Sequence, residues 1–193
     1  MDIRQERLIQ TFQQLVSIDS PSRHERRMAD TLIPMLRDAG LTVTEDDAGA
    51  RIGGDCGNLL ATWPSDDGLP PLLFCAHMDT VAPALGKRAV LDPDGTIHSA
   101  KDTVLGADDL SAVAAILEAV RVIHESGTRH RSVELLFSVS EEAYCAGVTA
   151  FDVSRIRSRE AYILDYEGAP GTAAIAAPTI LLFRAEISGK AAH

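Results

Sequence analysis

The chain has 193 residues, a formal net charge of −10 and 46% hydrophobic residues. This length allows one sizeable domain or a domain and a half, and the apolar share is enough for a buried core. The acidic balance argues against a general nucleic-acid binder, which needs a basic face. No stretch is long and apolar enough to cross a bilayer, and the charged N-terminus lacks the apolar core of a secretory signal. The sequence therefore predicts a protein that has neither a nucleic acid nor a membrane as its partner.

The cysteines indicate the redox compartment. Cys56, Cys75 and Cys145 are odd in number and far apart in the chain. Such cysteines fit the reducing cytoplasm, and they fit neither a disulfide framework nor a cysteine-based zinc site. We therefore expect a cytoplasmic protein in which Cys75, inside an apolar run, is a small core residue.

Two helices and two short strands are expected in the first third of the chain. Residues 3–16 carry apolar side chains at helical spacing, and a second helix, marked by Met28 and Leu36, ends at Gly40. Pro34 lies inside the second helix, where a proline weakens the pattern. The segments "LTVTE" and "GNLLATW" are typical of short strands around a glycine-rich turn from Gly49 to Gly57.

Strands alternate with helices in the rest of the chain. The apolar run "PLLFCA" is typical of a strand buried on both faces, and a looser segment with Asp-Gly and Pro-Asp pairs follows it as a hairpin. A clear helix covers "DDLSAVAAILEAVRVIHESG", and "SVELLFSVS" and "AYILDY" are two further strands. This order predicts an α/β fold with a mainly parallel sheet flanked by helices.

The last residues are expected to belong to a second domain. The segment "TILLFRAEISGKAAH" has the pattern of a long strand with a polar end, and no helix follows to cover it. An unpaired apolar strand is a poor end for a domain. We therefore divide the chain into residues 1–177, the N-terminal part of one domain, and residues 178–193, the start of another.

Acidic residues and one histidine follow the predicted strands. In open α/β sheets, ligands bind at the carboxyl ends of the strands. His77 and Asp79 follow "LLFCA", and further carboxylates come after the next two strands and at the start of the long helix. We expect one rim of the sheet to carry His77, Asp79, Asp108, Asp109, Glu141, Glu142 and Asp165.

Each of these side chains also has an ordinary structural explanation. A histidine can be a satisfied polar residue at a strand end, Asp79 can cap a turn, adjacent glutamates are usually a solvated pair, and Asp165 can be an exposed surface residue. Asp108 or Asp109 can be a helix cap, because free amides and the helix dipole favour a carboxylate there.

Taken together, however, the carboxylates would repel one another and raise one another's pKa. A divalent metal removes that conflict, and His, Asp and Glu ligands suit zinc, manganese or cobalt. Two ions with one shared carboxylate fit this set. An extra glutamate would then serve as general base for a metal-bound water.

Four motifs in order resemble one enzyme family. The segments "HMDTV", "LGADD", "EEAYCAG" and "ILD" are similar in sequence and separation to motifs of the dinuclear zinc exopeptidases, which include peptidase T, glutamate carboxypeptidase and the acylamino-acid deacylases. "HMDT" with "LGADDLSAVAAILEA" is most similar to the peptidase T-like branch, and "GNLLATW" matches the family's Gly-Asn strand. The resemblance covers nearly the whole chain and implies the α/β catalytic domain of that family.

The resemblance implies a set of zinc ligands. His77 would bind one zinc ion together with Asp165, and Asp108 would bridge both ions. Glu142 would bind the second ion.

The resemblance also implies two catalytic residues and a substrate-binding one. Asp79 would hold and polarise the imidazole ring of the first ligand. Glu141 would be the general base that deprotonates the bridging water and passes the proton to the leaving amine. "ISGKAAH" resembles the Gly-x-x-x-His motif of the family's lid domain, so His193 matches a position that reaches towards substrate, often in a partner subunit.

The complete enzyme implied by the resemblance is longer than this chain and a homo-oligomer. The family inserts a smaller lid domain and then returns to the catalytic domain, where a late histidine completes the second zinc site. We therefore expect an N-terminal fragment with a weak second metal site and poor activity. Exposed sheet edges and apolar surface would favour its association.

The function implied is metal-dependent hydrolysis of amide bonds in short peptides, with release of an N-terminal residue as by a tripeptide aminopeptidase. The alternatives are an N-acyl amino acid deacylase, a carboxypeptidase-like enzyme, and a non-catalytic truncated homologue that acts as a binding module. Intact motif residues favour an enzyme over such a relic. A serine or cysteine hydrolase has little support, because no Gly-x-Ser-x-Gly elbow occurs and Cys145 has no obvious base.

Overall fold

A five-stranded sheet forms the centre of the computed structural model, which describes residues 2–169, 171–177, 179, 181 and 183–190. Its strands are β1 (Thr42–Glu45), β2 (Leu59–Trp63), β3 (Leu72–His77), β6 (Val133–Ser138) and β7 (Glu160–Ile163). They lie in the order β1-β2-β6-β3-β7. β2 is antiparallel to β1 and β6, whereas β3 is parallel to β6 and β7, so four of the five strands point in one direction. The sheet is mixed, and the predicted α/β class is confirmed.

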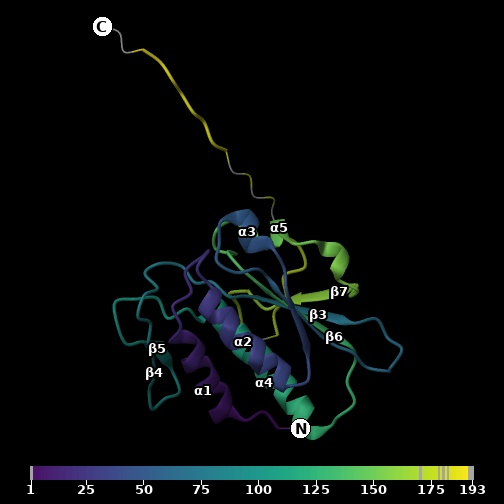
Figure 1. The fold of residues 1–193 in the computed structure, drawn as a ribbon. Coiled ribbons are helices and arrows are strands. Elements are labelled where there is room, and N and C mark those ends of the chain that lie inside the picture. Colours follow the sequence, from purple (N-terminus) through teal and green to yellow (C-terminus); the bar gives the residue numbers. More distant parts are fainter. Residues whose placement is uncertain (1, 170, 178, 180, 182, 191–193) are drawn as a thin grey trace.

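Three helices cover one face of the sheet, namely α1 (Gln5–Val16), α2 (Arg26–Asp38) and α4 (Ala107–Ser126) (Figure 1). Their apolar side chains pack with alternate strand residues such as Leu59 and Ala61, because successive strand residues face opposite sides. All three helices confirm the predicted periodic segments, and α2 continues through Pro34. Among the described residues, every helix falls short of the combined length and hydropathy that a membrane span requires.

The opposite face of the sheet is covered by the segment between β6 and β7. This segment contains two short helices, α5 (Ala146–Ala150) and η1 (Val153–Arg155), that were not predicted. Phe151 packs there with Leu60, Leu73 and Leu136 in a second, smaller apolar cluster. Cys75 packs against this cluster and is partly buried.

The predicted glycine-rich turn is partly wrong, because a short helix, α3 (Ala48–Ile52), lies at its start. Gly53 ends this helix in the left-handed conformation, with φ of 75°. Gly49 lies so close to the following loop that a Cβ atom on it would be 2.2 Å from the carbonyl oxygen of Cys56. The glycines therefore allow a tight helical turn where composition alone suggests only a loop.

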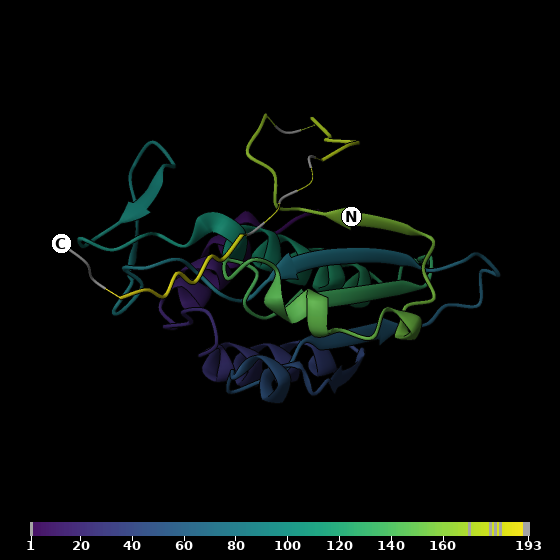
Figure 2. The ribbon, with the colours of Figure 1, turned by 90° about the horizontal axis from the view of Figure 1, so that it is seen from above.

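A two-stranded hairpin of β4 (Ala89–Leu91) and β5 (Ile97–Ser99) stands apart from the main sheet (Figure 2). The amide of Asp92 donates to the carbonyl of Thr96 at 2.8 Å, and Gly95 has a φ of 92° in the turn. This confirms the hairpin that the Asp-Gly pair predicts.

The strand predicted near the C-terminus is not seen. Residues 179, 181 and 183–190 have neither helix nor strand and are exposed. A strand is stable only where a neighbour supplies hydrogen bonds, and none of the described strands pairs with this segment. The rest of 178–193 lies outside the described residues, so the domain boundary at residue 178 stays a prediction.

Candidate metal centre

The carboxyl ends of β3, β6 and β7 meet at one rim of the sheet. In the parallel register His77 pairs with Ser138, and Cys75 pairs with Ile163. The residues that follow these three strands therefore emerge side by side, as the sequence predicts. The start of α4 joins them there, because Asp108 contacts His77.

His77 lies at the middle of this rim, with carboxylates around its Nε2 atom. Nε2 is 3.0 Å from Oδ1 of Asp108 and 4.0 Å from Oδ2 of Asp165. Each of these three residues offers one potential metal-ligand atom, and the three atoms lie within 4.8 Å of one another. His77 is only 2% exposed, whereas the side chain of Asp108 is 67% exposed, so the group opens to solvent on the Asp108 side.

This donor set fits a divalent metal ion. An imidazole nitrogen and two carboxylate oxygens suit zinc, manganese or cobalt. Ligand atoms about 2.1 Å from a tetrahedral ion lie roughly 3.4 Å apart, so small side-chain rotations would close the present spacing. Nδ1 of His77 lies 2.9 Å from the backbone carbonyl of Asp79. With Nδ1–H donating to that carbonyl, Nε2 is the ring nitrogen that would bind an ion in place of a proton.

Asp79 lies beneath His77 and joins three segments of the chain. Its carboxylate accepts the hydroxyl of Ser22 at 2.6 Å and the backbone amides of Glu141 and Glu142 at 2.9 and 3.1 Å. Oδ1 of Asp79 is 3.4 Å from Nδ1 of His77, and the Asp79 side chain is 0% exposed. This position would allow Asp79 to orient the imidazole ring of His77. The orienting role of Asp79 stays a prediction.

The start of α4 presents Asp108 and Asp109 in non-helical backbone conformations. Oδ1 of Asp108 lies at His77 Nε2, and Oδ2 of Asp109 accepts the backbone amide of His77 at 3.2 Å. Among the described residues, no amide of α4 donates to either side chain, so the capping explanation is wrong for both. Asp109 is only 2% exposed, and sequence reasoning offered it no part other than capping.

The crowded acids have raised pKa values. Burial and then the charge of Asp108 raise the pKa of Asp165 and of Glu142. Burial raises the pKa of Asp109 to about 7. Burial alone would lower the pKa of His77, but the neighbouring carboxylates raise it to about 10. Raised pKa values of several neighbouring acids are the electrostatic pattern that a bound cation would relieve.

Two predicted residues at the rim, Glu141 and Glu142, do not belong to the group formed by His77, Asp108 and Asp165. Oε2 of Glu141 is 4.0 Å from His77 Nε2, and its Oε1 accepts the thiol of Cys145 at 3.2 Å. Glu142 lies at the rim but does not join the group of close donors. His193 lies outside the described residues, so its substrate-binding role stays a prediction.

Two polar side chains hold the rim in place through hydrogen bonds. The sequence alone assigned neither of them a role. Ser22 holds Asp79, yet the segment "SIDSPS" signalled only a break between helices. Oδ1 of Asn58 accepts the amide of Val139 at 3.1 Å, and its Nδ2 donates to the carbonyl of Gly147 at 3.0 Å. Asn58 thus ties β2 to the loop that carries the two glutamates, which gives the Gly-Asn pair a structural meaning.

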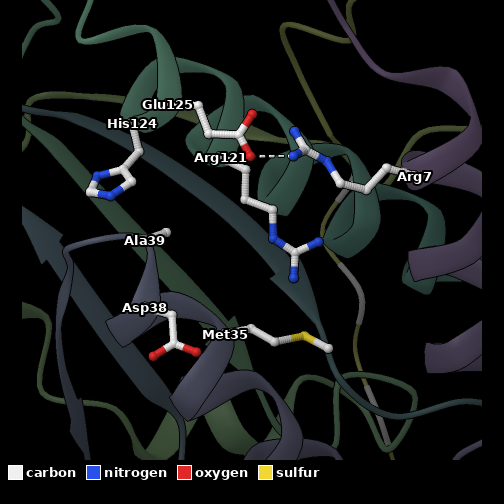
Figure 3. Close-up of a pocket in the computed structure, with 7 residues that line it drawn as sticks. All are labelled: Arg7, Met35, Asp38, Ala39, Arg121, His124 and Glu125. Carbon is white, nitrogen blue, oxygen red and sulfur yellow. Dashed lines mark hydrogen bonds and ion pairs between the residues drawn. The ribbon is translucent and has the colours of Figure 1, made fainter.

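A separate hollow lies near the other end of α4 (Figure 3). At about 1.5 Å per residue, the helix places it roughly 20 Å from Asp108. Arg7, which lines it, pairs with Glu118 and Glu125, so its charge is matched. The hollow has a volume of about 260 Å³ and is lined by Arg7, Met35, Asp38, Ala39, Arg121, His124 and Glu125.

Comparison with known proteins decides the family. Residues 58–173 match the model of peptidase family M28. The chain belongs to peptidase family M28. The matched range contains every zinc ligand and both catalytic residues implied by the sequence motifs, from His77 to Asp165.

Solved structures of peptidases share the fold of this M28 chain. The tripeptidase from Staphylococcus aureus subsp. aureus Mu50 is 33% identical with a TM-score of 0.83, over 86% of this chain and 44% of that one. The aminopeptidase PepT from Bacillus cereus ATCC 10987 is 39% identical, also with a TM-score of 0.83 and the same coverage of 86% and 44%. These matches confirm the predicted fold and the predicted similarity to peptidase T.

A curated relative matches along almost the whole chain. The uncharacterized protein YqjE of Bacillus subtilis (strain 168) is 37% identical over 191 residues, which cover 99% of this chain and 51% of YqjE. This M28 chain therefore spans about half the length of YqjE and of the two peptidases.

Proposed function

We propose that this M28 protein hydrolyses amide bonds in short peptides with a divalent metal, foremost zinc, held by His77, Asp108 and Asp165. The observation that carries the proposal is the approach of a buried imidazole and two carboxylates to within 4.8 Å at the rim. Membership of a peptidase family supports the reaction class. Similarity to a tripeptidase and to an aminopeptidase supports release of the N-terminal residue of a tripeptide.

The chain's own side chains would supply orientation and proton transfer. Asp79 would hold the His77 ring so that Nε2 faces the carboxylates. Glu141 would take the proton of the attacking water and deliver it to the leaving amine. Glu142 would contribute to the site of a second ion, with Asp108 shared between the two. A bound ion would polarise the scissile carbonyl and stabilise the negative charge that develops on it.

Metal binding tests the site on this chain directly. Zinc affinity would be measured by competition with a chromophoric chelator for the wild type, His77→Ala and His98→Ala. We expect His77→Ala to weaken binding at the rim at least about tenfold. His98→Ala is the matched control, because His98 is an exposed histidine that also pairs with an aspartate, Asp92, at 3.4 Å. Equal zinc binding by the wild type and His77→Ala would contradict the proposal.

Turnover of the complete protein separates the alternatives. We expect release of the N-terminal residue from tripeptides, and a loss in kcat of about 100- to 10,000-fold in Glu141→Gln with zinc retained. Faster hydrolysis of N-acetyl amino acids would favour the deacylase alternative, and release of the C-terminal residue would favour a carboxypeptidase-like enzyme. A zinc-loaded protein that hydrolyses none of these substrates would favour the binding module.

The cellular setting is part of the same proposal. A cytoplasmic location is supported by Cys56, Cys75 and Cys145, which are free thiols. The homo-oligomer rests on the family resemblance of the sequence motifs. Fractionation of cells and the solution mass of the complete protein test these two points.

A further inference from the structure

A second group of side chains whose chemistry suits a metal ion lies beside the start of α2, in contact with the loop after α3. One donor atom from each of Glu25, Asp55 and Cys56 lies within 4.8 Å of the other two. The group shares no residue with the candidate metal centre at the rim. It combines two carboxylates with a thiol, whereas the rim combines carboxylates with an imidazole.

Glu25 is buried at the back of this group, with an exposure of 0%. Its Oε1 accepts the amides of Arg23 and Ser140 at 3.0 and 2.8 Å and the hydroxyl of Ser140 at 3.2 Å. Its Oε2 is buried too, and no described residue donates a hydrogen bond to it. A buried carboxylate oxygen without a partner is costly, because nothing replaces the water that it loses on folding. Oε2 is therefore buried without a hydrogen-bond donor among the described residues.

Cys56 and Asp55 also have potential metal-ligand atoms that lack a close hydrogen-bond partner among the described residues. Cys56 is a free thiol with 4% exposure, and burial followed by the charge of Glu25 raises its pKa. Oδ1 of Asp55 accepts the amide of Arg26 at 3.0 Å, which leaves Oδ2 only the imidazole of His24, at 3.6 Å from Nδ1. Without a cation such a thiol stays protonated, whereas a bound metal would favour the thiolate.

We propose that Glu25, Asp55 and Cys56 bind a divalent ion of the zinc class, with His24 as the fourth ligand. Bonds of about 2.3 Å to sulfur and about 2.1 Å to nitrogen and oxygen place tetrahedral ligands roughly 3.4 to 3.7 Å apart. The present spacing of up to 4.8 Å thus contracts by about 1 Å on binding. His24 is assigned as the fourth ligand because its Nδ1 lies 3.6 Å from Oδ2 of Asp55 and its side chain is exposed.

The charges around the group are compatible with a cation. Two carboxylates and a thiolate would more than neutralise a divalent ion. Arg26 is the neighbouring cation, and its guanidinium is held by Glu45 at 2.8 and 3.0 Å and by Asp30 at 3.0 Å. Arg26 thus forms ion pairs with two acids outside the group. Burial raises the pKa of the Cys56 thiol, and the charge of Arg26 partly offsets that rise.

A bound ion would connect the N-terminal segment to the rim. Oε1 of Glu25 holds both the amide and the hydroxyl of Ser140, and Ser140 directly precedes Glu141. The amide of Asp55 donates to the carbonyl of Arg23 at 3.0 Å, so the loop after α3 is already in contact with the same segment. An ion on Oε2 would fix Glu25 and with it the loop that carries the general base; this consequence rests on the proposed function.

Cadmium titration tests the site, because a thiolate bound to cadmium gives an ultraviolet band that carboxylate and imidazole ligands do not give. The chain would be titrated with cadmium under a thiol-free reductant. We expect one equivalent of the band in the wild type, Cys75→Ser and Cys145→Ser, and none in Cys56→Ser. Cys145 is the informative control, because its sulfur lies 3.2 Å from Glu141 at the rim.

A second variant keeps the test decisive where Cys56→Ser folds poorly. Glu25→Gln keeps an oxygen for the amides of Arg23 and Ser140 and removes the negative charge, so cadmium affinity should fall at least about tenfold with an unchanged circular dichroism spectrum. His77→Ala should keep the band, which separates failure of this site from failure of the rim. The proposal is overturned by a wild type without the band, by a band in Cys56→Ser, or by unchanged affinity in Glu25→Gln.

Discussion

The carboxylate of Asp79 accepts three hydrogen bonds. One comes from the hydroxyl of Ser22, ahead of α2, and two come from the amides of Glu141 and Glu142, after β6. Burial alone would raise its pKa, but the bonds from His77 and Ser22 and these amides lower it overall. Asp79 therefore stays anionic beside the ring of His77. Through this contact, loops that are distant in sequence set the orientation of a single imidazole.

Replacing that carboxylate should weaken metal binding. In Asp79→Asn the side-chain amide presents N–H groups where backbone amides need an acceptor, so zinc affinity should fall about 10- to 100-fold in a chelator competition assay. Asp66→Asn, at an exposed position in the loop between β2 and β3, is the matched control. Unchanged affinity in Asp79→Asn would show that the backbone carbonyl of Asp79 alone orients the ring.

Gly106, directly before α4, has a backbone conformation and close neighbours that favour a residue without a side chain. Its φ is 78°, and a Cβ atom on it would lie 2.9 Å from Cγ2 of the buried Thr80. Gly106→Ala should lower the free energy of unfolding by about 1–2 kcal/mol for the left-handed backbone and a further ~1–3 kcal/mol for the overlap. Gly95→Ala has a φ of 92° and open space, so it isolates the first contribution. Equal losses in urea unfolding would exclude the overlap.

At the scale of elements, Lys87 connects two loops that carry the site. Its Nζ is buried and donates to Oγ1 of Thr80, after β3, at 2.8 Å. A Cβ atom on Gly106, before α4, would lie 3.4 Å from the same Nζ. Burial lowers the pKa of Lys87 to about 8. The lysine therefore lies between the segments that deliver His77 and Asp108.

The depressed pKa of Lys87 predicts a dependence of stability on pH. Between pH 8 and 10.5 the unfolded chain keeps the lysine proton while the folded chain has released it. The wild type should therefore gain stability relative to Lys87→Met as pH rises through this window, by an amount on the order of 3 kcal/mol. Urea unfolding at several pH values measures the difference, with Lys101→Met at an exposed lysine as control. A difference that is constant from pH 7 to 11 would contradict the prediction.

Elements with a strong repeating pattern were predictable from the sequence. α1 and α4 followed from apolar residues at helical spacing, and β3 and β6 from short segments rich in apolar residues. The five-residue helices α3 and α5 are too short for such a pattern, and contacts with each other and with the sheet determine them.

Only some residues of the candidate metal centre could be predicted from the pattern of strands and helices. His77, Asp108 and Asp165 follow strands or begin a helix, so topology alone brings them together. Glu25, Ser22 and Lys87 lie in irregular segments. The roles of Glu25 and Ser22 depend on contacts across more than fifty positions, with Ser140 and Asp79 respectively, and Lys87 contacts Thr80 within a loop that has no repeating pattern. No local pattern signals such contacts, which is why the sequence identified the donors but not the side chains that hold them.

At the scale of the whole molecule, β7 is an edge strand with apolar side chains on the surface. Tyr162 and Ile163 are 52% and 68% exposed, and the ring of Tyr162 stacks on Phe74 with centroids 5.5 Å apart. On the other side of β3, β6 takes up the remaining hydrogen bonds, so β7 alone presents a free edge at this end of the described sheet. Such edges favour pairing with a second copy.

Association through β7 is therefore expected of this chain. Ile163→Lys should weaken self-association at least several-fold in sedimentation velocity, because a charge on an edge strand opposes pairing. Ile3→Lys changes an isoleucine that is equally exposed, at 68%, but lies near the N-terminus, and should leave association unchanged. A wild type that stays monomeric at high concentration would contradict this expectation.

We propose above that His77, Asp108 and Asp165 hold a catalytic metal ion in this M28 chain. Crystals grown with zinc and measured on both sides of the zinc absorption edge test it most directly. We expect an anomalous peak about 2.0–2.2 Å from Nε2 of His77 and from one carboxylate oxygen each of Asp108 and Asp165. Zinc peaks elsewhere on the chain, with none within bonding distance of His77 Nε2, would contradict it.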